Sequence, residues 1–397
     1  MRIFAHIFAH ETFSCFSISI SFRVGKRQRG DVLYNSSLVI QYRCSRTAVL
    51  GTVRSYFVGS HFDFFGATSL FIVVVMEEGN GLADMVVSSH RAAAFSRNSL
   101  GGNPAAVVLL ASSVFPSERV MQSVAADFNL SETAFVAPVA SHVDDSFFIR
   151  WFTPTNEVDL CGHATLAAAF VVFEKRNACS IPKVITFRTM HRGDLKVSRR
   201  NDGALSMTFP SNPVDPMDDA ARRSFADRYS SVIQAVLRGI KAGAQCVESV
   251  HYSPGTKKMI LQLYPKFAHE LLNLSPDRDA MMRAHDGTVV RGVCVTVKGC
   301  EAALRATGLA SAYEAQALEK VDFCSRYFSP WNGIDEDPVN GSSHTALAPF
   351  WTREVGSRHR ELLAAQCSPR GGLLRVQFHP NADCVSIAGD ACFIAPS

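Results

Sequence analysis

The sequence lacks the marks of several protein classes. Its eleven cysteines are an odd number without CxxC spacing, which disfavours a zinc ribbon and a framework of paired disulfides. The longest apolar run, Ala67–Met76, is about half of the ~18 residues that a membrane-spanning helix needs. The net charge is only +4, and no basic stripe stands out. We therefore expect a cytoplasmic protein with reduced thiols that binds neither membrane nor nucleic acid.

The length and the hydrophobic content predict a folded protein of more than one lobe. A chain of 397 residues with 47% hydrophobic residues exceeds the ~250–300 residues at which a single core stops growing. Residues 1–85 differ from the rest, because they are rich in Phe and Arg and contain no helix with a capped start. They are interpreted as a poorly ordered extension or a gene-model artefact, with a transit peptide as the alternative.

An internal similarity predicts two lobes of one plan, over residues 86–200 and 201–397. The sequence DLCGHATLAAAFVVFE from Asp159 matches DPVNGSSHTALAPFWT from Asp337: each has an acid, a Gly-containing turn and an apolar helix. Periodicity also predicts a helix that Ser117 caps, with Val120, Val124 and Phe128 on one face. Further helices are expected at 218–240 and 301–320.

The two Gly-turn helices are the first candidates for a binding site. Both are apolar throughout and are therefore expected to be buried, which leaves N–H groups without partners at their first turns. An anion satisfies such groups well, since the helix dipole adds to the hydrogen bonds. A substrate carboxylate between the two helix starts is one hypothesis. The alternative is that Asp159, Asp337 or Ser342 caps its own helix.

Two titratable residues are candidates for chemistry. Glu132 begins an apolar strand, where burial would raise its pKa and make it a general acid/base near neutral pH. His163 follows a glycine at a helix start, where the dipole would lower its pKa and favour neutral imidazole. The alternatives are that Glu132 is a solvated residue at a strand end and that His163 is a packed histidine. No second histidine lies at the spacing of a helical metal site, so no metal is expected.

The same motifs resemble the phenazine-biosynthesis PhzF-like family of the diaminopimelate epimerase superfamily. The resemblance begins near Met85 and rests on GNPAAVVLL, NLSETAFV, RWFTPTNEVDLCGHATLA, SRYFSPW, EDPVNGSSHTALAPFW and CSPRGG. It implies an α+β fold of the diaminopimelate epimerase-like type. Two similar lobes would each wrap a curved β-sheet or barrel around a central helix, with the active-site cleft between them. It further implies a homodimer and a last strand, about 388–397, that crosses back to the first lobe.

The resemblance also implies an activity and a set of site residues. Members are cofactor-independent isomerases in which a Glu of the SETAF motif moves a proton between carbons of a small anionic substrate, and that Glu is Glu132 here. Other matching positions would hold the amino and carboxylate groups of the substrate. These are Gly162, His163, Asp337, Gly341 and Ser342.

The chain departs from its relatives at two positions. Epimerases of the superfamily place a thiol at each helix start, whereas this chain has Cys161 at one and Asn340, in place of the family's usual Thr, at the other. Because an amide carries no proton at neutral pH, a two-base racemase that uses Cys161 is disfavoured. Ala93 also replaces the usual Asp. An isomerase that uses Glu132 is the leading hypothesis, and a binding or scaffold protein that retains the fold is the other alternative.

Overall fold

The computed structural model describes residues 87–139, 145–175, 183–299, 320–356 and 360–394, together with short strands nearer the N-terminus. The chain forms two units, residues 1–53 and 54–397. The first unit contains an antiparallel sheet of β1 (Arg2–Ile3), β2 (Ser17–Phe22) and β3 (Leu38–Arg43). Most of the extension predicted at 1–85, and the helix predicted at 301–320, lie outside the described residues.

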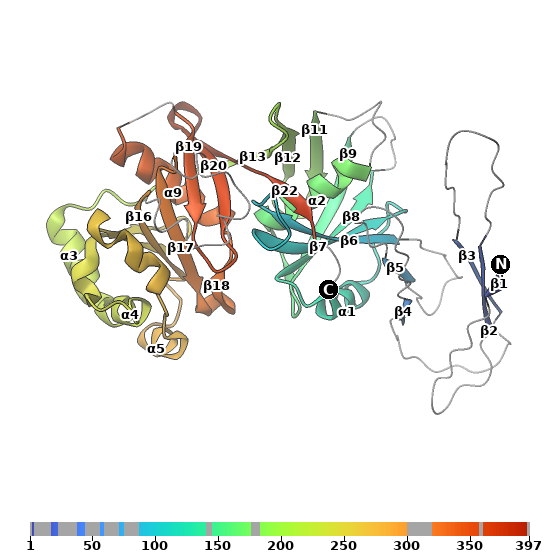
Figure 1. Ribbon diagram of the computed structural model, residues 1–397, viewed down its shortest axis with the longest axis horizontal. Helices are drawn as coiled ribbons and strands as arrows, with labels where there is room; N and C mark the ends of the chain where they lie inside the picture. Colours follow the sequence, from blue (N-terminus) through green and yellow to red (C-terminus); the bar gives the residue numbers. More distant parts are fainter. Residues whose placement is uncertain are drawn as a thin grey trace. The chain divides into compact units, whose positions relative to one another are not determined.

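The larger unit contains one series of elements twice (Figure 1). Two short strands precede it, β4 (Tyr56–Val58) and β5 (Phe71–Val74). The first series is β6 (Val87–Ala94), β7 (Asn103–Leu110), α1 (Glu118–Phe128), β8 (Glu132–Pro138), β9 (Ser146–Phe152), β10 (Glu157–Val158), α2 (Gly162–Lys175), β11 (Val184–Arg188), β12 (Asp194–Arg199) and β13 (Leu205–Pro210).

The second series begins after two helices, α3 (Asp219–Arg228) and α4 (Ser230–Val236). It is η2 (Gly243–Cys246), β14 (Val247–Ser253), β15 (Lys258–Leu263), η3 (Pro265–Asn273), α5 (Arg278–Ala284), β16 (Gly292–Lys298), β17 (Phe323–Ser329), η4 (Pro330–Asn332), β18 (Ile334–Asp337), α9 (Gly341–Glu354), β19 (Leu362–Gln366), β20 (Gly372–His379), η5 (Pro380–Ala382) and β21 (Cys384–Gly389), followed by β22 (Ala391–Phe393).

Strand pairing shows that the two series share one topology. Strands β7 and β8 are parallel, as are β15 and β16; β9 and β11 are parallel, as are β17 and β19. The central helices α2 and α9 form the connections of the second parallel pair in each series. Strand β13 joins β12 to β21, and β22 pairs with β6. The fold predicted from the sequence, two similar α+β lobes around central helices, is confirmed. The lobe boundary at residue 200 stays a prediction.

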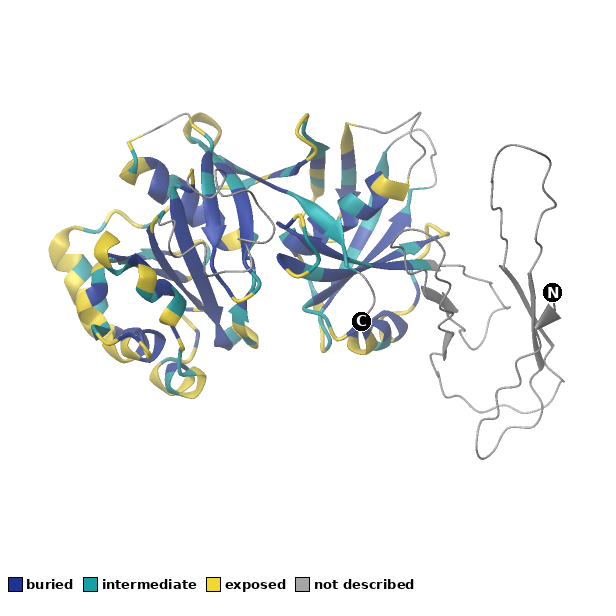
Figure 2. Ribbon diagram, viewed as in Figure 1, coloured by how far each residue is buried: buried dark blue, intermediate teal, exposed yellow. Residues whose placement is uncertain are grey.

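The central helices form where the sequence is apolar on all sides. Ten residues of α2 and nine of α9 are buried, so each helix is surrounded by strands rather than lying on a surface (Figure 2). The amphipathic α1 behaves as its spacing predicts: Val120, Val124 and Phe128 are buried. Ser117 precedes α1, but its side chain makes no capping hydrogen bond to the helix. The predicted helix at 218–240 is instead two helices, because the backbone at Tyr229 leaves the helical conformation.

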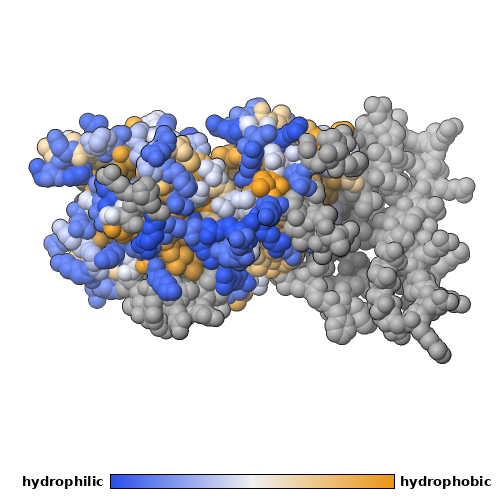
Figure 3. Space-filling view, turned by 90° about the horizontal axis from the view of Figure 1, so that it is seen from above, coloured by the Kyte–Doolittle hydropathy of each residue, from blue (hydrophilic) through white to orange (hydrophobic). Residues whose placement is uncertain are grey.

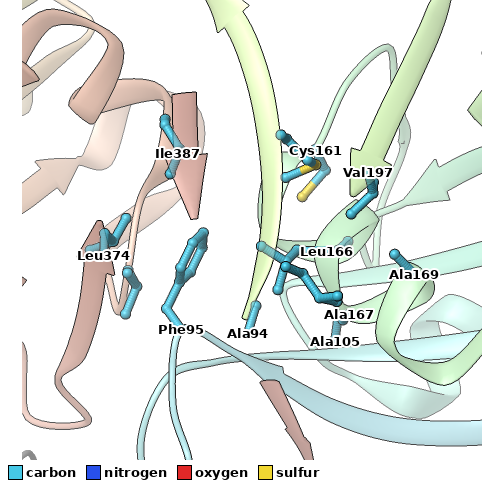
Figure 4. Packing of buried hydrophobic residues seen from close by; sticks show 14 of the residues in the cluster. Ala94, Phe95, Ala105, Cys161, Leu166, Ala167, Ala169, Val197, Leu374 and Ile387 are labelled. Atoms are coloured by element: carbon cyan, nitrogen blue, oxygen red, sulfur yellow. The ribbon is translucent and has the colours of Figure 1, made fainter. Parts of the chain in front are cut away.

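Phe95 connects the cores of the two lobes. It is fully buried beside Leu374 and Ile387, in the cluster that also contains Cys161 (Figure 4). Its φ of 66° is rare for a large side chain. Gly389 leaves room for the Phe95 ring, since a Cβ on this glycine would collide with it. The buried aromatic ring therefore fixes the junction of the lobes.

The surface is mainly hydrophilic, as expected for a folded protein of this composition. On the face in Figure 3, hydrophilic side chains dominate and hydrophobic ones form small groups between them. None of the described helices is long and apolar enough to cross a membrane.

Candidate active site

Glu132, His163 and Cys161 form a contiguous cluster in the first lobe. Glu132 is the first residue of β8 and His163 lies in the first turn of α2, and the two are 8% and 7% exposed. Glu132 Oε2 lies 3.2 Å from His163 Nε2, which also lies 3.2 Å from Ser131 Oγ. Cys161 Sγ lies 3.3 Å from His163 Nδ1. The imidazole therefore contacts both the carboxylate and the thiol.

The protonation states differ from those predicted from the sequence. Burial acts to raise the pKa of Glu132, but the charge of His163 and the polar groups of His163, Ser131 and Cys161 outweigh it and lower this pKa. Burial acts to lower the pKa of His163, but Cys161 and the Glu132 carboxylate raise it well above its usual range. Both predicted directions are thus wrong. The pair is a carboxylate and an imidazolium at neutral pH.

Burial, reinforced by the charge of Glu132, raises the pKa of the Cys161 thiol and keeps it protonated at neutral pH.

The cluster also contains three potential metal-ligand atoms, one each from Glu132, Cys161 and His163. These atoms lie within 4.8 Å of one another, a proximity that the sequence did not reveal. His163 contacts Glu132 through Nε2 and Cys161 through Nδ1. In this geometry the His163 ring links the carboxylate of Glu132 to the thiol of Cys161 through polar contacts.

Asp337 supplies a buried carboxylate from the second lobe. It ends β18, and its oxygens accept from Asn103 Nδ2 at 2.8 Å and from Asn340 Nδ2 at 2.6 Å. Asn103 begins β7 in the first lobe, so its hydrogen bond to Asp337 links the two lobes. Burial raises the pKa of Asp337; His163 acts in the opposite direction, and Glu132 adds to the increase. The protonation of Asp337 is therefore coupled to the charges of the Glu132–His163 pair.

Asn340 caps α9. Its Oδ1 accepts a hydrogen bond from the backbone N–H of Ser343 at 2.6 Å, so the interpretation of Asp337 or Ser342 as the cap is wrong. Asp159 pairs with Arg192 on the surface. Gly341 is half-buried and Ser342 is exposed, which leaves the first turn of α9 open to a ligand.

The structure brings the predicted residues to the starts of two helices that contact each other. Gly162 and His163 begin α2, Gly341 and Ser342 begin α9, and α2 contacts α9. A surface hollow of about 500 Å³ beside α4 and α5 is lined by none of these residues. Sequence reasoning missed two polar residues of the site, Asn103 and the buried Lys258, which donates to Ser342 Oγ at 2.6 Å.

The duplicated α+β plan with one central helix in each lobe is the epimerase-like fold. The family model described as "Phenazine biosynthesis-like protein" matches residues 92–396. The chain belongs to this family.

Individual relatives agree with this assignment. The chain is similar to phenazine biosynthesis-like domain-containing protein 2 of Mus musculus, with 37% identity over 76% of this chain and 94% of the relative. It is 34% identical to an uncharacterized isomerase of Pseudomonas aeruginosa over 78% and 97%. A solved phenazine biosynthesis PhzC/PhzF structure from Clostridium difficile is 29% identical and superposes with a TM-score of 0.58 over 78% and 97%.

Proposed function

We propose that the protein is a cofactor-independent isomerase that moves a proton on a small substrate with amino and carboxylate groups, with Glu132 as the general acid/base. Family membership and the relative named as an isomerase support an isomerase-type enzyme. One observation supports Glu132 most strongly. Its Oε2 is buried, and the 3.2 Å contact with His163 Nε2 does not satisfy it as a directed hydrogen bond. A substrate C–H or its transferred proton would provide the missing contact.

The lowered pKa of Glu132 means that this residue begins the reaction as a base. An ionised carboxylate acts as a base, so Glu132 takes a proton from one substrate carbon and returns it to another. The imidazolium of His163 stabilises the carboxylate before it takes the proton and again after it has returned it. Both electrons of the broken C–H bond stay on the substrate, so the reaction needs no oxidant.

The remaining residues hold the substrate. The N–H groups at Gly341 and Ser342, with those at Gly162, provide donors for the carboxylate. Asp337 offers a buried oxygen to the amino group, once Asn103 or Asn340 gives up its hydrogen bond. The homodimer implied by the resemblance stays a prediction.

Two experiments would identify the substrate class. Thermal shift against amino- and carboxylate-bearing metabolites would find ligands that bind the folded state. Each ligand would then be incubated with enzyme in deuterated water, and proton exchange at its carbons would be followed by NMR. Ligands that stabilise the protein but never exchange protons would favour the scaffold alternative.

The thiol alternative is tested by Cys161→Ala. We expect turnover to change less than about tenfold, because the raised pKa leaves Cys161 as a thiol and Asn340 offers no second base. The matched control is Cys246→Ala, which removes another fully buried thiol in a hydrophobic cluster of the second lobe. Abolished turnover in the Cys161 variant alone, with Glu132→Gln active, would establish a thiol mechanism.

A further inference from the structure

Lys258 is a buried cation beneath the first turn of α9. It begins β15 and is 4% exposed. Its Nζ lies 2.6 Å from Ser342 Oγ and 5.1 Å from the centre of the Tyr327 ring. The amino group therefore has one polar neighbour and one aromatic face, while Ser342 itself is exposed.

The charge of Lys258 has no ion-pair partner among the described residues. Asp337 is near enough to act on the lysine electrostatically, but its oxygens accept hydrogen bonds from Asn103 and Asn340. A buried cation without a paired anion destabilises a fold, and such groups are commonly retained for a function. An anion at the exposed start of α9 would provide the missing charge.

The directions of the hydrogen bonds connect Lys258 to the exposed start of α9. Lys258 has only protons to donate, so Ser342 Oγ accepts from it and directs its own proton to Asn340 Oδ1 at 2.9 Å. Asn340 Oδ1 already accepts from the N–H of Ser343. The hydroxyl proton of Ser342 can therefore rotate to an arriving anion while Lys258 keeps its hydrogen bond.

We propose that Lys258 is the positioning cation of an anion subsite at the start of α9, and that the substrate places a carboxylate there against Ser342. This inference rests on the proposed function in one respect, that the start of α9 faces the substrate. Lys258 acts through Ser342, whose hydroxyl it holds as a donor, and through the attraction between its charge and the carboxylate.

The surroundings make this subsite sensitive to pH. Burial lowers the pKa of Lys258 to about 8, against the opposing effects of Cys294 and Asp337. Burial raises the pKa of Cys294 to about 12, raises those of Tyr327 and Asp337, and lowers that of His344 to about 4. Lys258 loses its charge as pH rises through about 8, so anion affinity should be constant below this pH and fall above it.

The test uses benzoate, a carboxylate that stays ionised between about pH 6.5 and 9.5. Calorimetric titration of the full chain should show affinity that falls by up to about tenfold per pH unit above pH 8. Lys258→Met should weaken binding at pH 7 by about tenfold or more, the scale of one charged hydrogen bond, and remove this pH dependence. Lys258→Arg should keep the affinity and make it independent of pH, since guanidinium stays charged.

Controls separate this proposal from its alternatives. Neutral benzamide should bind all three proteins equally, and the melting temperature of Lys258→Met should equal or exceed that of the parent, because an unpaired buried charge is removed. Equal benzoate affinity in the parent and Lys258→Met would overturn the subsite. A pH dependence that persists in Lys258→Met and Lys258→Arg would show that another group controls anion affinity, and it would also overturn the proposal. Benzoate binding needs no proton transfer, so a failure of the isomerase proposal would leave these results unchanged.

Discussion

Replacing Glu132 by Gln is expected to lower turnover by ~10²–10⁴, the contribution of one general acid/base. The amide retains the size of the carboxylate and can still accept a hydrogen bond from His163, but it cannot take a proton from carbon. Substrate binding should survive. The measurement is proton exchange of an identified substrate in deuterated water, together with its dissociation constant for both proteins.

Glu118→Gln is the matched control, because Glu118 pairs with Arg150 on the surface and its side chain is 73% exposed. It should leave exchange and binding unchanged. Full turnover by Glu132→Gln would remove Glu132 from the mechanism. Loss of both binding and turnover would instead indicate that the carboxylate mainly holds the substrate.

Replacing Arg326 by Met should destabilise the second lobe by ~3–5 kcal/mol, the usual result of breaking a buried ion pair. Arg326 lies in β17 with a side chain 8% exposed, and it binds both oxygens of Glu336 at 2.7 Å. Its Nη1 donates to the carbonyls of Leu271 and Leu274 in and beside η3. Methionine would leave a carboxylate and these carbonyls without partners. Glu336 directly precedes Asp337, so site geometry should suffer as well.

Thermal unfolding tests this expectation, with a decrease in melting temperature on the order of 10 °C for a protein of this size. The control is Arg192→Met, which breaks the pair with Asp159 at 3.2 Å, where both side chains are more than half exposed. Its effect should lie within about 1 kcal/mol. Equal effects of the two substitutions would show that the Arg326–Glu336 pair makes no special contribution.

Local patterns in the sequence predicted the elements of the site, but not its electrostatics. The apolar composition around Gly162 and after Gly341 predicted two buried helices, and the repeat from Asp159 and Asp337 predicted their equivalence. The neighbours of Glu132 and His163 in the sequence also identified each of them as a candidate. Their pKa directions were predicted wrongly, because each was considered alone, whereas in the fold each is the charged partner of the other.

Asn103 and Lys258 were missed because their partners are distant in sequence. Asn103 bonds to Asp337 across 234 positions, and Lys258 bonds to Ser342 across 84. Lys257 and Lys258 are adjacent in the sequence, yet the first is exposed and the second is buried. Lys257 precedes the strand with a φ of 53°, whereas Lys258 is the first residue of β15, whose first four residues are all buried.

The return of β22 to β6 affects how this protein emerges from the ribosome. Residues 92–94 of β6 pair with 391–393, near the opposite end of the chain. At ~5–20 residues per second, synthesis of the intervening segment takes on the order of 15–60 seconds, during which this part of β6 has an open edge. Open edges recruit other strands, so the nascent first lobe is the stage at which chaperone binding or aggregation should concentrate. Ribosome-bound chains that end before residue 390 would then remain protease-sensitive in β6, and release of the complete chain would protect it.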